Sequence, residues 1–157
     1  FMAIVYLSIG SNLGDRKTNC RKAVDKIREA GVEIKKLSSM YETKPCGLTD
    51  QPDFVNMAAE IVTEIKPIEL LNIFKNIEHK MGRKEGIKWG PRIIDIDIIF
   101  YDDIIFESSE LKIPHLHLHK RDFVLRPMSE IAPDKKHPLK NKTVTELLEE
   151  INNAQES

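Results

Sequence analysis

The chain has 157 residues, of which 41% are hydrophobic, so it is long enough for one domain with a buried core, and we expect a single domain over residues 1–157. Its net charge is −1 although 31% of its residues are charged, which excludes the strong field of a protein that binds nucleic acid or an anionic membrane. The two cysteines lack metal-binding spacing, and no apolar stretch near the N-terminus is long enough for a secretory or spanning segment. We therefore expect a cytoplasmic protein with reduced thiols.

The first part of the chain changes from a strand pattern to a helix pattern and back. Residues 3–9 form an apolar run that predicts a strand and ends in Gly10-Ser11-Asn12. Asp15 can cap the helix that follows, because apolar residues then recur at helical spacing until Gly31. Residues 33–43 predict a second strand.

Two more strands and a second helix follow, and two loops separate them. The loop over residues 44–53 contains two prolines and one glycine and is long enough to cover a ligand. Residues 54–65 predict a half-exposed strand with one apolar face. Pro67 opens a helix that Gly82 ends, and residues 93–101 predict a fourth strand.

The element order βαββαβ is the split βαβ arrangement of ferredoxin-like folds, so we expect an α+β protein with an antiparallel sheet flanked by helices. A C-terminal extension follows this core. Residues 104–106 and 111–113 suggest a hairpin, and residues 123–131 suggest a short helix broken by Pro127. Residues 143–151 begin with a capping box and predict a final helix.

Two acidic residues share one face of the fourth predicted strand. Asp95 and Asp97 are two apart and therefore lie side by side, about 7 Å between Cα atoms. The even-numbered positions form the opposite, apolar face: Ile94, Ile96, Ile98 and Phe100. A pair of carboxylates suits Mg²⁺, with substrate phosphates completing the coordination. The alternative is a solvated strand face, and it is weakened because Ile93 and Ile99 would lie beside the acids.

A basic loop over residues 82–92 leads directly into these acids, with four cations, three glycines and one tryptophan in eleven residues. Arginine matches phosphate oxygens bidentately, so Arg83 and Arg92 at the two ends are the expected triphosphate ligands. The glycines would let the loop close as a lid. A loop that is only solvated is the alternative, although Trp89 then lacks a reason to be there.

Aromatic and histidine side chains supply further candidates. Phe54 and Asn56 point to the same side of their strand, where they could stack on and hydrogen-bond a flat heterocycle or pack under the 44–53 loop. Phe123 could be the second side of such a stack or part of the core. Three alternating histidines, His115, His117 and His119, allow a zinc site, but beside two further basic residues a cationic wall is the preferred interpretation.

Four segments taken together resemble the 6-hydroxymethyl-7,8-dihydropterin pyrophosphokinase family. They are Gly10-Ser11-Asn12-Leu13-Gly14, Gln51-Pro52-Asp53-Phe54-Val55-Asn56, Trp89-Gly90-Pro91-Arg92-Ile93-Ile94-Asp95-Ile96-Asp97 and Pro114-His115. The likeness extends over residues 3–133. Its W-G-P-R-x-x-D-x-D string is specific, because it joins the lid, a phosphate ligand and the metal pair in a fixed order.

The resemblance implies an enzyme of folate biosynthesis that binds ATP with two Mg²⁺ ions and then the pterin alcohol, whose oxygen attacks the β-phosphorus so that AMP leaves. Asp95 and Asp97 would hold both ions, and the implied catalytic residues are these two with Arg83 and Arg92. The residues implied to bind ATP are Glu78, Arg83, Trp89, Arg92, Ile98, His115 and Arg121. Those implied to bind the pterin are Thr43, Pro45, Gly47, Phe54, Asn56, Asp95 and Phe123.

The chain departs from the family pattern at a few positions. The lid is one residue shorter than in some members, and Glu85 stands where an arginine is common. Three departures concern the adenosine side: Lys75, Glu110 and Leu116.

Two other classes of function are weighed against this one. A ligand-sensing module without turnover would not need the arginines, and a zinc-dependent hydrolase built on the histidines would leave Asp95 and Asp97 unexplained. The expected partners are ATP and the pterin substrate, without nucleic acid or membrane, and a monomer is expected.

Overall fold

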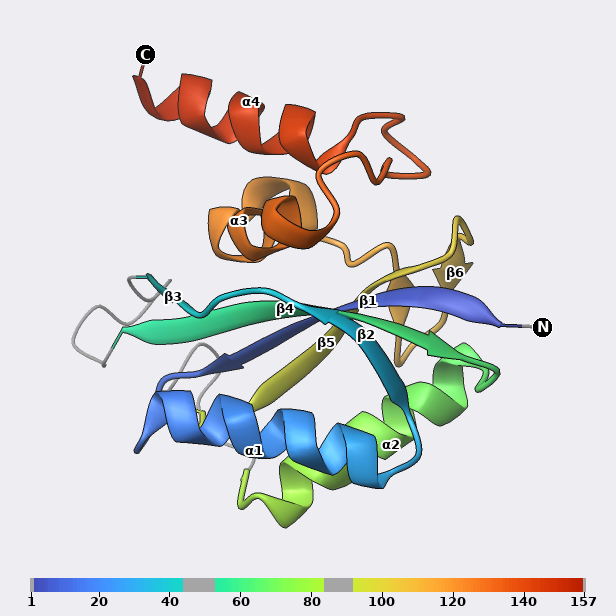
Figure 1. Ribbon diagram of the computed structural model, residues 1–157. Coiled ribbons are helices and arrows are strands. Elements are labelled where there is room, and N and C mark those ends of the chain that lie inside the picture. The colour runs from blue at the N-terminus through green and yellow to red at the C-terminus, as the bar shows by residue number, and fades with distance from the viewer. Residues whose placement is uncertain (1, 44–52, 84–91, 157) are drawn as a thin grey trace.

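The computed structural model describes residues 2–43, 53–83 and 92–156, which fold into layers. A sheet lies in the middle, helices α1 (Arg16–Glu29) and α2 (Pro67–Lys80) cover one of its faces, and α3 (Asp122–Ile131) covers the other (Figure 1). The last helix, α4 (Val144–Glu156), lies on the outer side of α3. No helix within the described ranges is long and apolar enough to cross a membrane.

The central sheet has five strands, and all of its pairs are antiparallel. The strands are β1 (Ala3–Ser11), β2 (Glu33–Leu37), β3 (Tyr41–Thr43), β4 (Phe54–Thr63) and β5 (Asp95–Tyr101). Their order is β2-β4-β1-β5, and β3 pairs with another part of β4. With β2 and β3 taken as two parts of one strand, this is the predicted βαββαβ order, so the predicted fold class is confirmed.

The predicted strand over residues 33–43 is interrupted at Ser38, so the prediction of one continuous strand is wrong. Ser38 Oγ accepts a hydrogen bond of 2.8 Å from the backbone N–H of Ala58, and its own N–H donates to Ala58 O at 2.9 Å. The hydroxyl thus takes the place of a strand carbonyl. The next N–H, of Ser39, donates to the Glu130 carboxylate on α3 at 3.0 Å, which turns the chain before β3 begins.

Most helix ends lie where their sequence signals predict. The Asp15 side chain accepts a hydrogen bond of 3.2 Å from the N–H of Thr18 and so caps α1, and Pro67 is the first residue of α2. At the start of α4, Thr143 and Glu146 each accept a hydrogen bond of 3.1 Å from the other's backbone N–H. These reciprocal bonds confirm the predicted capping box.

The C-terminal extension contains the predicted hairpin, formed by β6 (Phe106–Glu107) and β7 (Lys112–Ile113). A short 3₁₀ helix, Leu118–Lys120, precedes α3. The predicted break at Pro127 is wrong, since α3 continues through it. Proline removes one helical hydrogen bond, but burial of the apolar side of α3 against the sheet keeps the helix intact.

A bulge in β5 changes which residues face each side of the sheet. Leu7 of β1 is opposite Ile98, but Tyr6 is opposite Phe100, so Ile99 is an extra residue on β5. Before the bulge, Ile98 packs on the α1 and α2 side, and after it Phe100 packs on the α3 side, with its ring centroid 6.4 Å from that of Tyr6. The prediction that Phe100 shares a face with the even-numbered isoleucines is therefore wrong.

The residues predicted to flank the acids are placed differently from each other. Ile99 lies on the α3 side, the face of the acids, as predicted. Ile93 precedes β5, which begins at Asp95, and it packs against the core on the α1 and α2 side. That part of the prediction is wrong, because the strand alternation does not extend back to Ile93.

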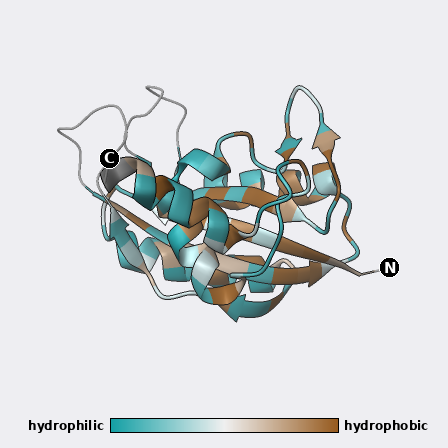
Figure 2. Ribbon diagram, turned by 90° about the horizontal axis from the view of Figure 1, so that it is seen from above, coloured by the Kyte–Doolittle hydropathy of each residue, from teal (hydrophilic) through white to brown (hydrophobic). Residues whose placement is uncertain are grey.

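Helices pack on both sides of β4, and most of its residues are buried, so the prediction of a half-exposed β4 is also wrong. Val55 and Ile61 are fully buried against α1 and α2, while Ala58 on the opposite face is 1% exposed beneath α3. Figure 2 shows the result: the central strands are largely hydrophobic, and the helices alternate between hydrophilic and hydrophobic residues. The sequence of β4 alone does not show that α3, which comes much later in the chain, packs on this face.

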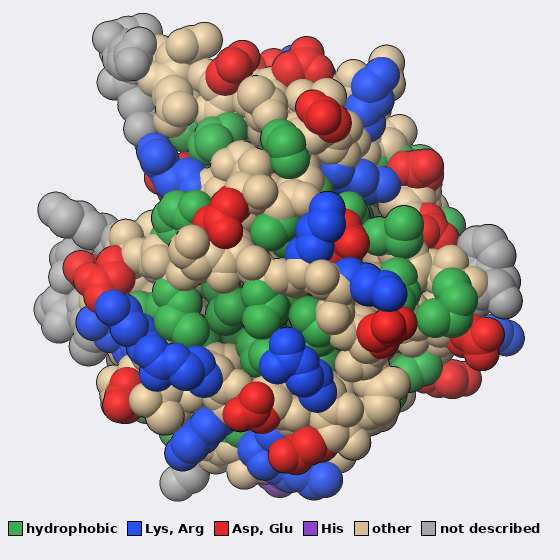
Figure 3. Space-filling view, in the orientation of Figure 1, with side chains coloured by type: hydrophobic (Ala, Val, Ile, Leu, Met, Phe, Trp, Pro, Cys, Tyr) green, Lys and Arg blue, Asp and Glu red, His purple; other side chains and the backbone are tan. Residues whose placement is uncertain are grey.

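Charged side chains of both signs are interspersed over the face seen in Figure 3, while hydrophobic side chains gather in a band over the edge of the sheet. This mixture agrees with a net charge of −1. A binding site for anions on this protein must therefore be made by a local group of cations.

Candidate active site

A cavity of about 550 Å³ extends along β5, between α2 and α3. It is lined by every predicted site residue that lies in the described part of the chain: Thr43, Phe54, Asn56, Glu78, Arg83, Arg92, Asp95, Asp97, Ile98, His115, Arg121 and Phe123. The other predicted residues, Pro45, Gly47 and Trp89, lie outside the described residues. The fold thus brings together side chains from β3, β4, α2, β5 and α3 that are up to eighty positions apart.

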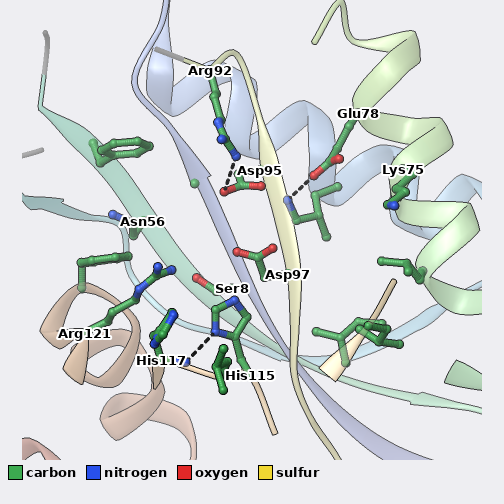
Figure 4. A pocket seen from close by; sticks show the side chains of 18 of the residues that line it. Ser8, Asn56, Lys75, Glu78, Arg92, Asp95, Asp97, His115, His117 and Arg121 are labelled. Atoms are coloured by element: carbon green, nitrogen blue, oxygen red, sulfur yellow. Dashed lines mark hydrogen bonds and ion pairs between the residues drawn. The ribbon is translucent and has the colours of Figure 1, made fainter. Parts of the chain in front are cut away.

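Asp95 and Asp97 project into this cavity from the same side of β5 (Figure 4). They are opposite Gly10 and Ser8 of β1, respectively, so small side chains lie next to both carboxylates. Burial raises the pKa of Asp97 well above its ordinary value, and the negative charges of Asp95 and Glu78 raise it further. The positive charges of Arg121 and Arg83 act in the opposite direction but do not cancel these effects.

Two arginines lie against the first of these acids. Arg83 Nη1 is 2.9 Å from Asp95 Oδ1 and 2.8 Å from Glu78 Oε1, and Arg92 Nη1 is 3.8 Å from Asp95 Oδ2. Both arginines are only partly exposed, so these ion pairs are screened less than pairs in open solvent. The predicted phosphate ligands and the predicted metal ligands are therefore in direct contact.

Glu78 joins α2 to the beginning of β5. The residue is only 7% exposed, and its Oε2 accepts a hydrogen bond of 2.7 Å from the backbone N–H of Ile96. Burial is the largest cause that raises its pKa, and the hydrogen bond from Ile96 opposes that shift. With Oε1 on Arg83, this carboxylate fixes the guanidinium beside Asp95.

Asn12 fixes the position of the second arginine. The backbone N–H of Arg92 donates to Asn12 Oδ1 at 2.7 Å, and the N–H of Asn12 donates to Arg92 O at 3.1 Å. Asn12 is fully buried, so this pair of hydrogen bonds is protected from water. The Gly10-Ser11-Asn12 segment thus ends β1 and at the same time holds the segment that leads into β5.

His115 is a neutral donor at the wall of the cavity. Burial lowers its pKa to about 4, and the positive charge of Arg121 acts in the same direction. Its Nδ1 accepts a hydrogen bond of 3.4 Å from the N–H of His117 (Figure 4), which leaves the proton on Nε2. Its backbone N–H donates to Ile99 O at 3.1 Å, so the histidine is anchored at the bulge of β5.

The three histidines do not share one site. His115 and His117 line the cavity, whereas His119 lies outside its lining, and its Nδ1 is buried with no hydrogen-bond partner among the described residues. Within that part of the chain no three His, Cys, Asp or Glu side chains are grouped to hold a metal ion. The zinc hypothesis gains no support, and a cation at the two acids would need ligands from a bound substrate.

The other end of the cavity combines aromatic and amide groups. Phe54 and Asn56 of β4 and Phe123 of α3 line it, and the Asn56 side-chain N–H donates to Thr43 Oγ1 at 3.2 Å. The guanidinium carbon of Arg121 is 5.6 Å from the centre of the Phe123 ring. Phe123 is only half-buried, so its ring belongs both to the edge of the α3 core and to the cavity.

Comparison with known proteins decides the family. Residues 6–133 match the family described as 7,8-dihydro-6-hydroxymethylpterin-pyrophosphokinase (HPPK). The chain belongs to this family. A 2-amino-4-hydroxy-6-hydroxymethyldihydropteridine pyrophosphokinase of Aquifex aeolicus is 46% identical over 145 residues, which cover 92% of this chain and 90% of that protein. A protein of the same name from Bacillus subtilis is 44% identical, over 82% of this chain and 78% of its own length.

A solved structure of the same family has the same fold. The crystal structure of Plasmodium falciparum HPPK-DHPS with pterin and p-hydroxybenzoate matches 99% of this chain with a TM-score of 0.79 and 18% identity. At that identity the likeness supports the fold alone. The chain spans 44% of the length of that structure's chain.

Several residues of this HPPK-family cavity were not predicted from the sequence as site residues. They are Ser8, Gly10, Leu71, Ile96 and Leu111. Lys75, Glu110 and Leu116, which the sequence associated with the adenosine side, also line the cavity, as does His117. Ser8 sits inside an apolar strand, where a hydroxyl gives no signal of its own. Its place beside Asp97 follows only from the pairing of β1 with β5.

Proposed function

We propose that this chain transfers pyrophosphate from ATP to the hydroxymethyl group of 6-hydroxymethyl-7,8-dihydropterin, with release of AMP, in folate biosynthesis, and that it does so in the cavity along β5. Membership of the HPPK family supports the reaction. The observation that supports the location is the acid pair of Asp95 and Asp97, which lies between two arginines and an aromatic slot in one cavity.

Asp95 and Asp97 would hold the magnesium, and two ions are proposed. The donor set fits, because carboxylate oxygens are the ligands that Mg²⁺ prefers, and a cation there would offset the burial and the negative neighbours that raise the pKa of Asp97. When bound, Mg²⁺ would supply Lewis-acid stabilisation of charge on the phosphate oxygens. Residues of the chain must do the rest: hold the nucleotide, hold the pterin and align them.

Arg83 and Arg92 would bind the phosphates that are transferred. Both lie against Asp95, where they offset part of the negative charge. We propose that they exchange this carboxylate for phosphate oxygens when ATP and its cations enter, since arginine binds both groups with the same planar fork of donors. Glu78 would keep Arg83 in reach during the exchange, because its own ion pair with that arginine does not involve Asp95.

His115 and Arg121 would contact ATP on the other side of β5. The Nε2–H of neutral His115 is a donor for a phosphate or ribose oxygen, and a pKa of about 4 keeps it in that form at physiological pH. Glu78 and Ile98 would lie near the nucleoside. Trp89 is proposed to help close the lid, because the family resemblance implies this role.

Phe54, Asn56 and Phe123 would hold the pterin, with Asp95 and the backbone near Thr43, Pro45 and Gly47 completing its site. Stacking on an aromatic ring orients a flat heterocycle, and the slot lies next to the acid pair, so the hydroxymethyl group can face the phosphates. The hydroxyl oxygen then forms a bond with the β-phosphorus while the bridging bond to the α-phosphate breaks. Such a transfer depends mainly on positioning and charge stabilisation.

Product analysis tests this proposal. The chain is incubated with ATP, Mg²⁺ and 6-hydroxymethyl-7,8-dihydropterin, and nucleotides are separated by chromatography. AMP in equal amount to the pterin pyrophosphate is expected, with no turnover when the metal is removed by a chelator. ADP would indicate an ordinary kinase, and the absence of nucleotide turnover would favour a ligand-sensing module.

We also propose that the protein acts as a monomer in the cytoplasm and binds no nucleic acid. The net charge of −1 and the mixed charges on the face seen in Figure 3 support the last point. Light scattering coupled to gel filtration would test the first, with a single species of 18.1 kDa expected.

A further inference from the structure

Gly10 lines the cavity and lies between two groups of the site. In the pairing of β1 it is directly opposite Asn56 on β4 and directly opposite Asp95 on β5. Neighbouring strands are about 4.8 Å apart, so the backbones of these two residues are separated by roughly 10 Å, with only Gly10 between them. Any side chain at this position would stand between the two groups.

The Asn56 amide occupies the space that a side chain at position 10 would need. Asn56 is only 4% exposed, its Nδ2 is held by Thr43 Oγ1 at 3.2 Å, and its Oδ1 lies over β1. A Cβ built on Gly10 would be 2.5 Å from that Oδ1, a distance that Cβ atoms essentially never show. The next nearest atoms, Asn56 Cγ and Val55 O, would be at 3.5 Å, an ordinary contact.

The orientation of this amide has a consequence for recognition. With an Nδ2 hydrogen given to Thr43, the Oδ1 over Gly10 accepts no hydrogen bond from the described residues, and Asn56 lines the cavity, so this oxygen is available to a ligand. An acceptor in this position suits a ligand edge that carries N–H donors. The amino group and ring N–H of a pterin's pyrimidine half are such an edge.

We propose that Gly10 is a positioning residue of the pterin site: the missing side chain lets Asn56 lie across β1 with its carbonyl presented to the ligand. This inference rests on the proposed function, because it assigns Asn56 to the pterin. It makes Gly10 a determinant of pterin affinity and not of nucleotide affinity. A methyl group there would push the Oδ1 aside, since the end of a side chain yields more easily than strand backbone.

The first test is Gly10→Ala, with the fluorescence of 6-hydroxymethylpterin as the probe in the presence of Mg²⁺ and α,β-methylene-ATP. The Kd for the pterin should rise roughly tenfold or more, as expected for a buried hydrogen bond that is lost or misaligned. The Kd for the nucleotide alone, measured by calorimetry, should change less than twofold. A pterin Kd equal to the wild type, or an equal loss of both ligands, would contradict the proposal.

The double variant is the matched control. In Asn56→Ala there is no Oδ1 to displace, so adding Gly10→Ala should leave the pterin Kd and the Tm of that variant unchanged. If Gly10→Ala alone folds poorly, Asn56→Ala should restore its Tm. Effects of the two substitutions that simply add, or a Tm that is not restored, would overturn the inference. Failure of the proposed function is a separate result, in which the wild-type protein forms no AMP.

Discussion

The two faces of the central sheet differ in how completely they are closed. Beneath α1 and α2 the face is a continuous apolar core, from Leu7 and Ile9 of β1 to Phe74 of α2. On the other face α3 covers only one half, around Tyr6 and Phe100, and the other half is the cavity. The contrast teaches that the site occupies the half of this face that α3 does not cover. Polar side chains there line a cavity and do not have to be buried in the apolar core.

Asp97→Asn should give the largest effect and should separate function from stability. We expect turnover to fall by at least about a thousandfold, because a charged ligand of the proposed metal is lost. The free energy of unfolding should not fall, since a neutral amide replaces a charge that burial and Asp95 disfavour. AMP formation and urea unfolding measure the two quantities.

Asp25→Asn is the control for this variant, because Asp25 is an exposed acid on α1 that does not line the cavity. It should leave both quantities unchanged. Near-normal turnover in Asp97→Asn would reject the metal-binding role.

Phe74→Ala should show the opposite pattern on the closed face. The side chain is fully buried in the α1 and α2 core, so its truncation should cost about 3–5 kcal/mol of the unfolding free energy. The kcat of the molecules that remain folded at low temperature should stay close to that of the wild type. A loss of kcat in a variant that keeps its stability would mean that the two faces are not independent.

Phe123→Ala tests the border between the half that α3 seals and the half left open. We expect the pterin Kd to rise by roughly ten- to a hundredfold, as for a lost aromatic contact in a binding site, with little change in nucleotide affinity. The unfolding free energy should fall less than in Phe74→Ala, because Phe123 is only half-buried. If the variant does not fold, the Phe123 ring is a necessary part of the core.

The smallest effect concerns pH on the sealed half. His137 is 4% exposed, burial lowers its pKa from 6.5 to about 4, and the charges of Lys140 and His119 add to the shift. Between these two values the unfolded chain binds a proton that the folded protein does not, so stability falls as pH falls from 6.5 to 4. His115 contributes in the same direction.

His137→Asn isolates this contribution. The amide oxygen can still accept the hydrogen bonds that Nδ1 receives from the N–H groups of Leu139 and Lys140, but it does not titrate in this range. Urea unfolding at several pH values should therefore show a shallower loss of stability below pH 6.5. An unchanged slope would mean that the imidazole is protonated in the folded state.

Features encoded within a few consecutive residues were predictable from the sequence. The cap at Asp15, the capping box at Thr143 and the apolar stripe of α2 depend on spacing within one helix. The acids and the two arginines lie within fifteen consecutive positions, so their proximity follows from the chain itself. Their roles as ligands stay predictions.

Features that depend on a partner strand were not predictable. The bulge at Ile99 exists only in the pairing of β5 with β1, and the interruption at Ser38 depends on Ala58 of β4. The same is true of Gly10, whose importance comes from the strand on each side of it. A sequence pattern shows how residues alternate along a strand, but it does not show which residues of the neighbouring strand lie opposite them. The roles of these residues depend on that register.

The bulge at Ile99 also bears on how freely this protein can change. It divides β5 into an acidic segment and an aromatic segment, and the second begins one position out of phase with the first. Variation among the residues before the bulge can therefore alter ligand chemistry while the buried rings beyond it keep their packing partners. Deletion of that single isoleucine would restore a regular alternation with Phe100 still facing α3, but it would remove the Ile99 carbonyl that accepts the hydrogen bond from the His115 N–H, so this position should tolerate substitution better than deletion.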